Sequence, residues 1–284
     1  MNNISNGKWD YIIRPKRGLF DLRLHEIMEY RDLLFMFVMR DFVTLYKQTI
    51  LGPFWFVLQP LITMAVFTVI FSKIARIPTD GVPPAVFYLS GIIIWNYFSN
   101  CLTKTSGIFV QNASIYGKVY FPRLVIPIAR IISGLISFLI QLLLFLVVIA
   151  WLYIADNKIT MNMYVFMVPV YVVLTGLTGL GAGLIISALT TTYRDLGFLV
   201  GFGVQLLMFA TPVIYPMSII PDQYRVFIAW NPVAHIVEGF RYAFLGVGEI
   251  SLPGMAYTFA FAILLLLTGI ILFNRVERNF MDTV

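Results

Sequence analysis

The sequence has little charge and almost no cysteine or histidine. Only 12% of its 284 residues are Asp, Glu, Lys or Arg, whereas soluble domains carry about 25%. The single cysteine, Cys101, excludes an intrachain disulfide and a cysteine-based metal site. The only two histidines, His25 and His235, form no cluster, so we expect no metal centre.

The sequence also lacks the motifs of several enzyme classes. No G-x-x-x-x-G-K-[ST] pattern occurs, so the chain has no P-loop in which to hold ATP phosphates. No HExxH and no G-x-S-x-G pattern is present either. We therefore expect no cofactor in this chain, and a transport role would need power from a separate subunit that binds ATP and Mg²⁺.

Hydrophobic residues make up 60% of the chain, and they gather in six stretches without a single Asp, Glu, Lys or Arg. A helix needs roughly 20 apolar residues to cross the hydrocarbon core of a bilayer. Each stretch has 23 to 35 residues. The sequence therefore predicts an all-α integral membrane protein with six transmembrane helices, at Gln48–Ser72, Gly81–Thr103, Ile131–Ala155, Ile159–Tyr193, Leu196–Pro221 and Ile250–Asn274.

The distribution of Lys and Arg predicts the orientation. Fifteen fall in the N-terminal segment, the tail and the gaps after the second and fourth stretches, and five fall on the other side. Because Lys and Arg collect in the cytoplasm, both termini should be cytoplasmic. The net charge of +6 then reflects topology, and we expect no nucleic-acid partner.

Residues 1–47 form a predicted cytoplasmic segment that precedes a membrane domain of residues 48–284. Within the segment, residues 24–45 predict an amphipathic interface helix. Its acids, Glu26, Glu29 and Asp32 among them, favour a protein neighbour as much as a lipid anchor. The predicted apolar stripe consists of Leu24, Ile27, Met28, Leu34, Phe35, Val38, Phe42 and Leu45, and Asp41 is expected on the polar side.

Two polar segments interrupt the apolar stretches on the cytoplasmic side. Residues Gln111–Arg123 are too polar to span and predict a short helix. Arg194 and Asp195 predict a turn between the fourth and fifth spans, with either a structural ion pair or a partner-docking role. Within the fifth span, Thr211-Pro212 predicts a kink.

Residues of about 221–248 are apolar but carry several charges, so they cannot form a simple span. Asn231 and Pro232 predict a helix N-cap and first turn, and Gly246 predicts the end of that helix. We expect two short helices that form a re-entrant hairpin in the outer leaflet. The candidate gate residues are Trp230, Asn231, Pro232, His235, Glu238 and Arg241.

Aromatic residues are candidates for a neutral path, because their faces can stack on sugar rings. Belts at the membrane interface and lipid-facing positions explain many of them equally well. The candidates are Phe54, Trp55, Phe198, Phe202, Phe209 and Tyr215. Gly197, Gly201 and Gly203 would allow close approach of another helix, from this chain or a second copy.

Five motifs in order along the chain resemble the membrane subunit of polysaccharide-exporting ABC transporters, the O-antigen and teichoic-acid permeases with a type-2 ABC exporter fold. The motifs are Tyr46–Leu61, Lys118–Ala129, Tyr193–Tyr215, Asn231–Gly246 and Val276–Val284. The resemblance implies a homodimer in a bacterial inner membrane, with the first and fifth spans around a channel and the hairpin as outer gate.

The resemblance further implies two copies of a separate ABC ATPase subunit and an undecaprenyl-linked glycan as cargo, with O-antigen as the first expectation. The interface helix and cytoplasmic loops would dock the ATPase. The implied docking residues are Glu26, Glu29, Asp32, Tyr116, Lys118, Tyr120, Arg194 and Asp195.

Alternatives remain open at this level. The nearer ones are a permease for teichoic acid or capsule, or an exporter of small lipids or drugs with the same fold. The more distant one is a membrane-embedded enzyme or scaffold, with Glu238 and Arg241 as catalytic groups. A helix-surface ion pair at this i, i+3 spacing is equally consistent with those two residues.

Overall fold

A computed structural model describes residues 24–47, 49–116, 121–156, 162–193 and 195–283. Those residues contain helices and turns but no strand. The α-helices are α1 Leu24–Glu29, α2 Arg31–Tyr46, α3 Trp55–Phe67, α4 Pro84–Ser106, α5 Ile108–Gln111, α6 Ala113–Tyr116, α7 Val125–Asp156, α8 Val168–Thr192, α9 Leu196–Phe209, α10 Asp222–Ala229, α11 Pro232–Leu245 and α12 Leu252–Thr283.

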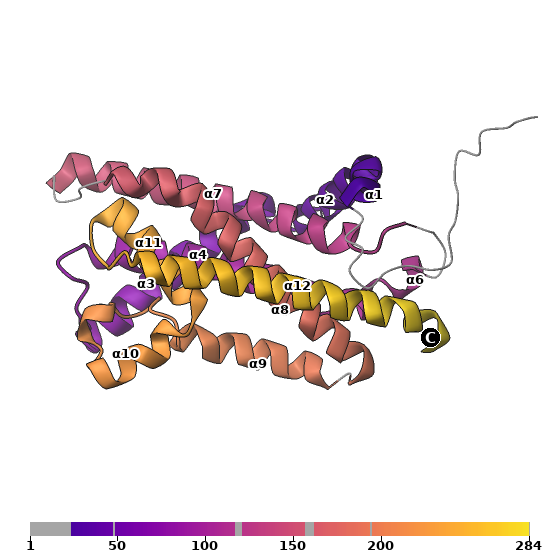
Figure 1. Ribbon diagram of the computed structural model, residues 1–284. Helices are drawn as coiled ribbons and strands as arrows, with labels where there is room; N and C mark the ends of the chain where they lie inside the picture. Colours follow the sequence, from indigo (N-terminus) through magenta and orange to yellow (C-terminus); the bar gives the residue numbers. More distant parts are fainter. Residues whose placement is uncertain (1–23, 48, 117–120, 157–161, 194, 284) are drawn as a thin grey trace, which may run out of the picture.

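Short 3₁₀ and π-helical segments extend some of these helices. A 3₁₀ turn, Gly52–Phe54, leads into α3, and a π-helical segment, Thr68–Ile74, continues it. Two further 3₁₀ turns are Met163–Met167 and Met217–Ile219. The long helices lie side by side in one bundle, with α10 at one end and α6 and the C-terminal residues at the other (Figure 1).

Within the described residues, five helices are long and apolar enough to cross a membrane. They are Gly52–Ile74, Pro84–Ser106, Val125–Ala155, Met163–Thr192 and Leu252–Val276. Each matches one of the six predicted stretches to within a few residues. The chain is therefore a multi-pass membrane protein, and the prediction of an all-helical fold is confirmed.

The predicted fifth span differs from the other five. Its helix, α9, has 14 residues, which gives a length of about 21 Å against a core of about 30 Å. The chain leaves the helix at Ala210 and turns through Thr211 to Pro212. The predicted kink at Thr211-Pro212 is thus wrong, because the helix ends there. The residue before a proline disfavours helical geometry, which accounts for the stop.

The core of the bundle lies around α4 and α8. In their spanning windows, 78% and 67% of residues are buried, against 6% in α3. Helix α8 crosses α12 closely at Gly181, where an added Cβ would lie 2.6 Å from the carbonyl carbon of Leu265. Small residues allow such backbone contact between transmembrane helices. Helix α3 is therefore the span most open to lipid or to another chain.

The residues predicted to form an amphipathic helix are helical, although the helix breaks at Tyr30 into α1 and α2. Its apolar stripe is wrong in part. Met28 and Phe35, predicted within the stripe, are exposed, whereas Phe37 and Asp41 are buried with Ile27 and Val38. The buried face packs on α7 and belongs to one hydrophobic cluster with residues of α5 and α6, and this packing rotates the helix away from the predicted orientation.

Candidate functional site

The bundle end that carries α10 has a buried ion pair at its centre. The guanidinium of Arg241 donates from Nη1 to Oε1 of Glu238 at 2.7 Å, and the two side chains are 1% and 5% exposed. The guanidinium also lies over the ring of Phe87 in α4, 3.8 Å from its centroid. The predicted i, i+3 ion pair is therefore confirmed, and the pair is enclosed by the protein.

Arg241 also holds the chain where α9 has ended. Its Nη2 donates to the carbonyl oxygens of Pro212 at 2.8 Å and Val213 at 3.4 Å. These carbonyls belong to the non-helical chain that follows α9, and a buried carbonyl without a partner is costly. Arg241 thus satisfies these carbonyls and joins α11 to the end of α9.

A second link at this end runs through Asn231. Its side-chain oxygen accepts from the backbone N–H of Val233, which confirms the predicted N-cap of α11. Its Nδ2 donates to Oγ1 of Thr211 at 2.8 Å. Gly246 adopts a left-handed conformation with φ of 70° and closes α11, as predicted. The start of the hairpin helix is therefore fixed to the end of α9.

The remaining predicted gate residues lie around this centre. A ring nitrogen of His235, Nε2, lies 2.9 Å from the carbonyl oxygen of Ala229, and Pro232 occupies the first turn of α11. Trp230 is 74% exposed, and its carbonyl oxygen accepts from the hydroxyl of Tyr257 at 2.8 Å. Helix α11 is thus core, while α10 and Trp230 form the outer surface of the hairpin.

The buried pair argues against a catalytic role. A general acid or base must come within hydrogen-bond reach of a substrate. Glu238 and Arg241 are enclosed by α4, α11 and the end of α9. Among the described residues, no group of three or more His, Cys, Asp or Glu side chains could hold a metal ion.

Five of the six predicted path residues are exposed, on α9, at the start of α3 and in the 3₁₀ turn that leads into α3. Phe54, Trp55, Phe198, Phe202 and Phe209 are all exposed, whereas Tyr215 is half-buried and donates to the carbonyl oxygen of Phe209 at 2.9 Å. An added Cβ at Gly197, Gly201 or Gly203 would meet no atom within 4 Å. The alternative that these glycines pack tightly against a span of the same chain is therefore wrong.

A half-open cavity of about 350 Å³ lies between the first turns of α9 and the helices α4, α5 and α8, and Gly197 and Gly201 open into it. Polar side chains of α4, α5 and α8 contribute to its lining, and so do two glycines of α9. Its lining residues are Thr103, Ser106, Gly107, Val110, Gln111, Thr190, Gly197, Val200 and Gly201. The first turns of α9 are therefore loosely packed against the rest of the bundle.

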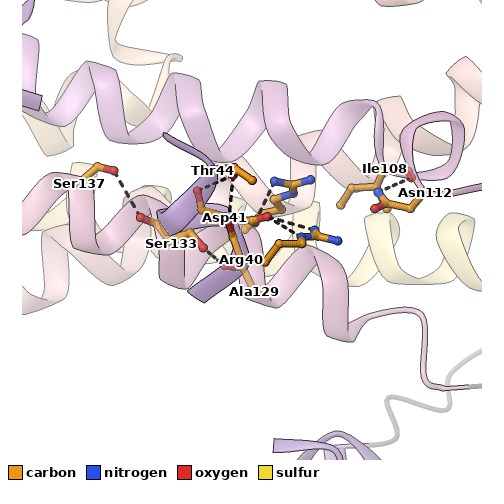
Figure 2. A network of polar contacts seen from close by, with 9 residues as sticks. Arg40, Asp41, Thr44, Ile108, Asn112, Ala129, Ser133 and Ser137 are labelled. Carbon is orange, nitrogen blue, oxygen red and sulfur yellow. Dashed lines mark hydrogen bonds and ion pairs between the residues drawn. The ribbon is translucent and has the colours of Figure 1, made fainter. Parts of the chain in front are cut away.

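Helix α2 is fixed to the third span by a carboxylate that the sequence had placed on the polar side. Asp41 is buried, and its Oδ2 lies 2.8 Å from Nη1 of Arg130 in α7. Its Oδ1 accepts from Nε and Nη2 of Arg40 at 3.2 and 3.0 Å. Figure 2 shows Arg40 and Thr44 around Asp41, with Ser133 and Ser137 following along α7. The spacing of Val38 and Asp41 on one helix face is the signal that could have identified it.

The predicted docking residues fall into three groups. Glu26, Glu29 and Asp32 lie on α1 and α2, where Asp32 is 99% exposed. Tyr116 is buried against Phe109 and Phe121, so it shapes the loop rather than presenting a free surface. Asp195 is exposed and caps α9 by accepting from the N–H of Leu196. Lys118, Tyr120 and Arg194 lie outside the described residues.

Comparison with known proteins identifies relatives along most of the chain. The family model for ABC-2 type transporters matches residues 32–245. An O-antigen export system permease protein RfbA of Klebsiella pneumoniae is 26% identical over 251 residues, 88% of this chain and 94% of the relative.

Two further relatives carry related names. RfbA of Myxococcus xanthus, also an O-antigen export system permease protein, is 29% identical over 224 residues, 78% of this chain and 83% of its own. The polysialic acid transport protein KpsM of Escherichia coli is 26% identical over 243 residues, 84% of this chain and 92% of its own.

Proposed function

The chain belongs to the ABC-2 type transporter family, and on that premise we propose that it is the channel-forming permease subunit of an O-antigen exporter in a bacterial inner membrane. The chain is a transport subunit, and the ATPase is a separate subunit. The cargo would be an undecaprenyl-linked polysaccharide that moves from the cytoplasm to the outer face. Of the three relatives described above, two are named O-antigen export permeases and one is named a polysialic acid transport protein. These names favour O-antigen as the cargo.

The observation that carries the proposal is the exposed face of α9. Phe198 is 87% exposed and Phe202 is 60% exposed, although both lie in an apolar helix of a membrane protein. Together with the open α3, this face suits a second copy of the chain and a path between the copies. We propose a homodimer on this basis, with two ATPase subunits on the side of α1, α2 and α6.

We also propose that α9 and the hairpin together make the sixth crossing. Helix α9 covers about two-thirds of the core thickness. The turn at Thr211 and the helices α10 and α11 would fill the remaining third in the outer leaflet. A non-helical backbone at this depth needs protein cover, and Asn231 and Arg241 supply partners to its carbonyl and hydroxyl groups. The hairpin would then act as the outer gate.

Reconstitution tests the assignment. The pure chain in proteoliposomes should hydrolyse no ATP, and addition of the ATPase encoded with it should give turnover that a lipid-linked glycan stimulates. Transport would appear as glycan that becomes accessible to a glycosidase on the far side of the vesicle. Stimulation by a small amphiphilic drug but not by the glycan would contradict the proposal and favour the small-molecule alternative.

A further inference from the structure

Three cationic side chains from three helices surround the single carboxylate of Asp41. Arg40 comes from α2, Arg130 from α7 and Lys104 from the last turn of α4. Arg40 and Arg130 contact Asp41 directly, at 3.0 and 2.8 Å. Lys104 lies within electrostatic range of both Arg130 and Asp41. The cluster therefore carries two more positive charges than negative ones.

The carboxylate cannot satisfy all three cations. Both of its oxygens are engaged, Oδ1 by Arg40 and Oδ2 by Arg130. The Nε of Arg130 is buried and makes no hydrogen bond, and the ion pairs of Asp41 with described residues go to Arg40 and Arg130 rather than to Lys104. An uncompensated charge near the membrane core is costly, and it is a marker of a functional site. The cluster is thus incomplete without another anion.

The position of the cluster indicates what kind of anion would complete it. It lies between membrane-spanning helices near one end of the bundle, where basic pockets bind the head groups of anionic lipids. Met36, one turn before Arg40, and the neighbouring Met39 are exposed apolar side chains of α2. They offer a surface to hydrocarbon chains that a soluble anion would not use.

We propose that Lys104, Arg130 and Arg40 bind the phosphate of a lipid at the junction of α2, α4 and α7. Lys104 supplies an ammonium that does not pair with Asp41, and Arg130 uses Nη1 for Asp41 while its Nε makes no hydrogen bond. Asp41 holds the two arginines in position. A membrane phospholipid and a phosphorylated polyisoprenoid share this chemistry, and the site does not depend on the proposed cargo.

Native mass spectrometry of the full chain in an uncharged detergent tests the proposal. The probes are phosphatidylglycerol, undecaprenyl phosphate and zwitterionic phosphatidylcholine. Lys104→Met removes one cation and keeps the apolar stem, and Arg40→Gln removes another at the more exposed edge. Lys47→Met, at an exposed site just after α2, is the matched control. Thermal unfolding of each variant checks that it folds. If Lys104→Met does not fold, the binding measured for Arg40→Gln decides the test.

The expected result is a loss of about tenfold in affinity for at least one anionic probe in Lys104→Met or Arg40→Gln, which is the scale of one charge-assisted hydrogen bond. Lys47→Met should bind as the unmodified chain does. Preference for phosphatidylglycerol would identify a structural phospholipid, and preference for undecaprenyl phosphate would identify the carrier. The proposal would be overturned if all three lipids bound with equal affinity and these affinities did not change in a folded Lys104→Met or Arg40→Gln variant. It would also be overturned if neither anionic lipid bound.

Discussion

At the scale of single residues, the fold depends on a few buried polar side chains that connect elements far apart in the sequence. Arg241 reaches carbonyls 28 and 29 residues earlier in the chain. The sequence predicted that Glu238 and Arg241 could pair, because they lie one helical turn apart. The sequence could not predict that Arg241 also binds the carbonyl oxygens of Pro212 and Val213, since these carbonyls are available only because α9 ends before them.

Replacing Arg241 by methionine should be strongly destabilising. The change would leave the carboxylate of Glu238 buried without its partner, and removing one member of a buried pair costs about 3–5 kcal/mol. The free energy of unfolding in detergent, measured by chemical denaturation, should fall by that amount. The double variant Glu238→Gln, Arg241→Met leaves no orphaned charge and should recover part of the loss. A double variant as unstable as the single one would contradict the account.

Replacing Asp41 by asparagine should loosen α2 from α7. The substitution removes the charge that pairs with Arg130 and Arg40, and a hydrogen bond to a charged group is worth about 1.5–3 kcal/mol. Hydrogen exchange of residues 31–46 should then become at least about tenfold faster. Asp32→Asn, at a fully exposed site of the same helix, is the control and should exchange as the unmodified chain does. Equal protection in both variants would show that Asp41 does not hold the helix.

At the scale of elements, hydrophobic run length predicted five spans well, whereas the fifth stretch along the chain forms a helix too short to cross the bilayer by itself. Uncharged residues from Leu196 to Pro221 were long enough for a crossing, but only the first 14 form a helix. Run length counts apolar residues and does not register where a backbone stops being helical. The dipeptide Thr211-Pro212 indicated where the helix would end. The sequence could not show that Asn231 and Arg241 would supply hydrogen-bond partners to the non-helical chain after α9, because these contacts form only in the folded protein.

The exposed side of the hairpin should control the seal of the path. Helix α11 is part of the core, so removing it would damage the fold; Phe227 and Trp230 are exposed and can be changed alone. The double variant Phe227→Ser, Trp230→Ser should keep its stability and let small ions leak through planar bilayers. Trp151→Ser, at another exposed aromatic site, is the control. A variant that stays sealed would show that the outer surface of the hairpin is not the gate.

At the scale of the whole molecule, the single chain leaves its most apolar surfaces without partners. Composition and charge predicted a membrane protein without an energy source of its own, and the five motifs indicated the family that the comparisons identify. Neither could predict how copies assemble, because an exposed aromatic side chain in a bilayer can face lipid, a second copy or a path equally well.

Cysteine cross-linking tests the assembly. In a Cys101→Ala background, Phe54→Cys and Phe202→Cys should form a disulfide between copies, because both sites are exposed at the start of the first span and on the open face of α9. Leu143→Cys, exposed on α7, is the control and should stay monomeric on a denaturing gel. Cross-linking through α7 alone would place the interface elsewhere.

The most direct test of the proposed function is the location of the glycan after loss of this chain. Deleting its gene in the native host should leave lipid-linked polysaccharide inside the inner membrane and remove it from the cell surface. The unmodified chain should restore export, and a chain with Phe198 and Phe202 replaced by aspartate should not. Normal surface polysaccharide in the deletion strain, with no lipid-linked polymer retained inside, would contradict the account.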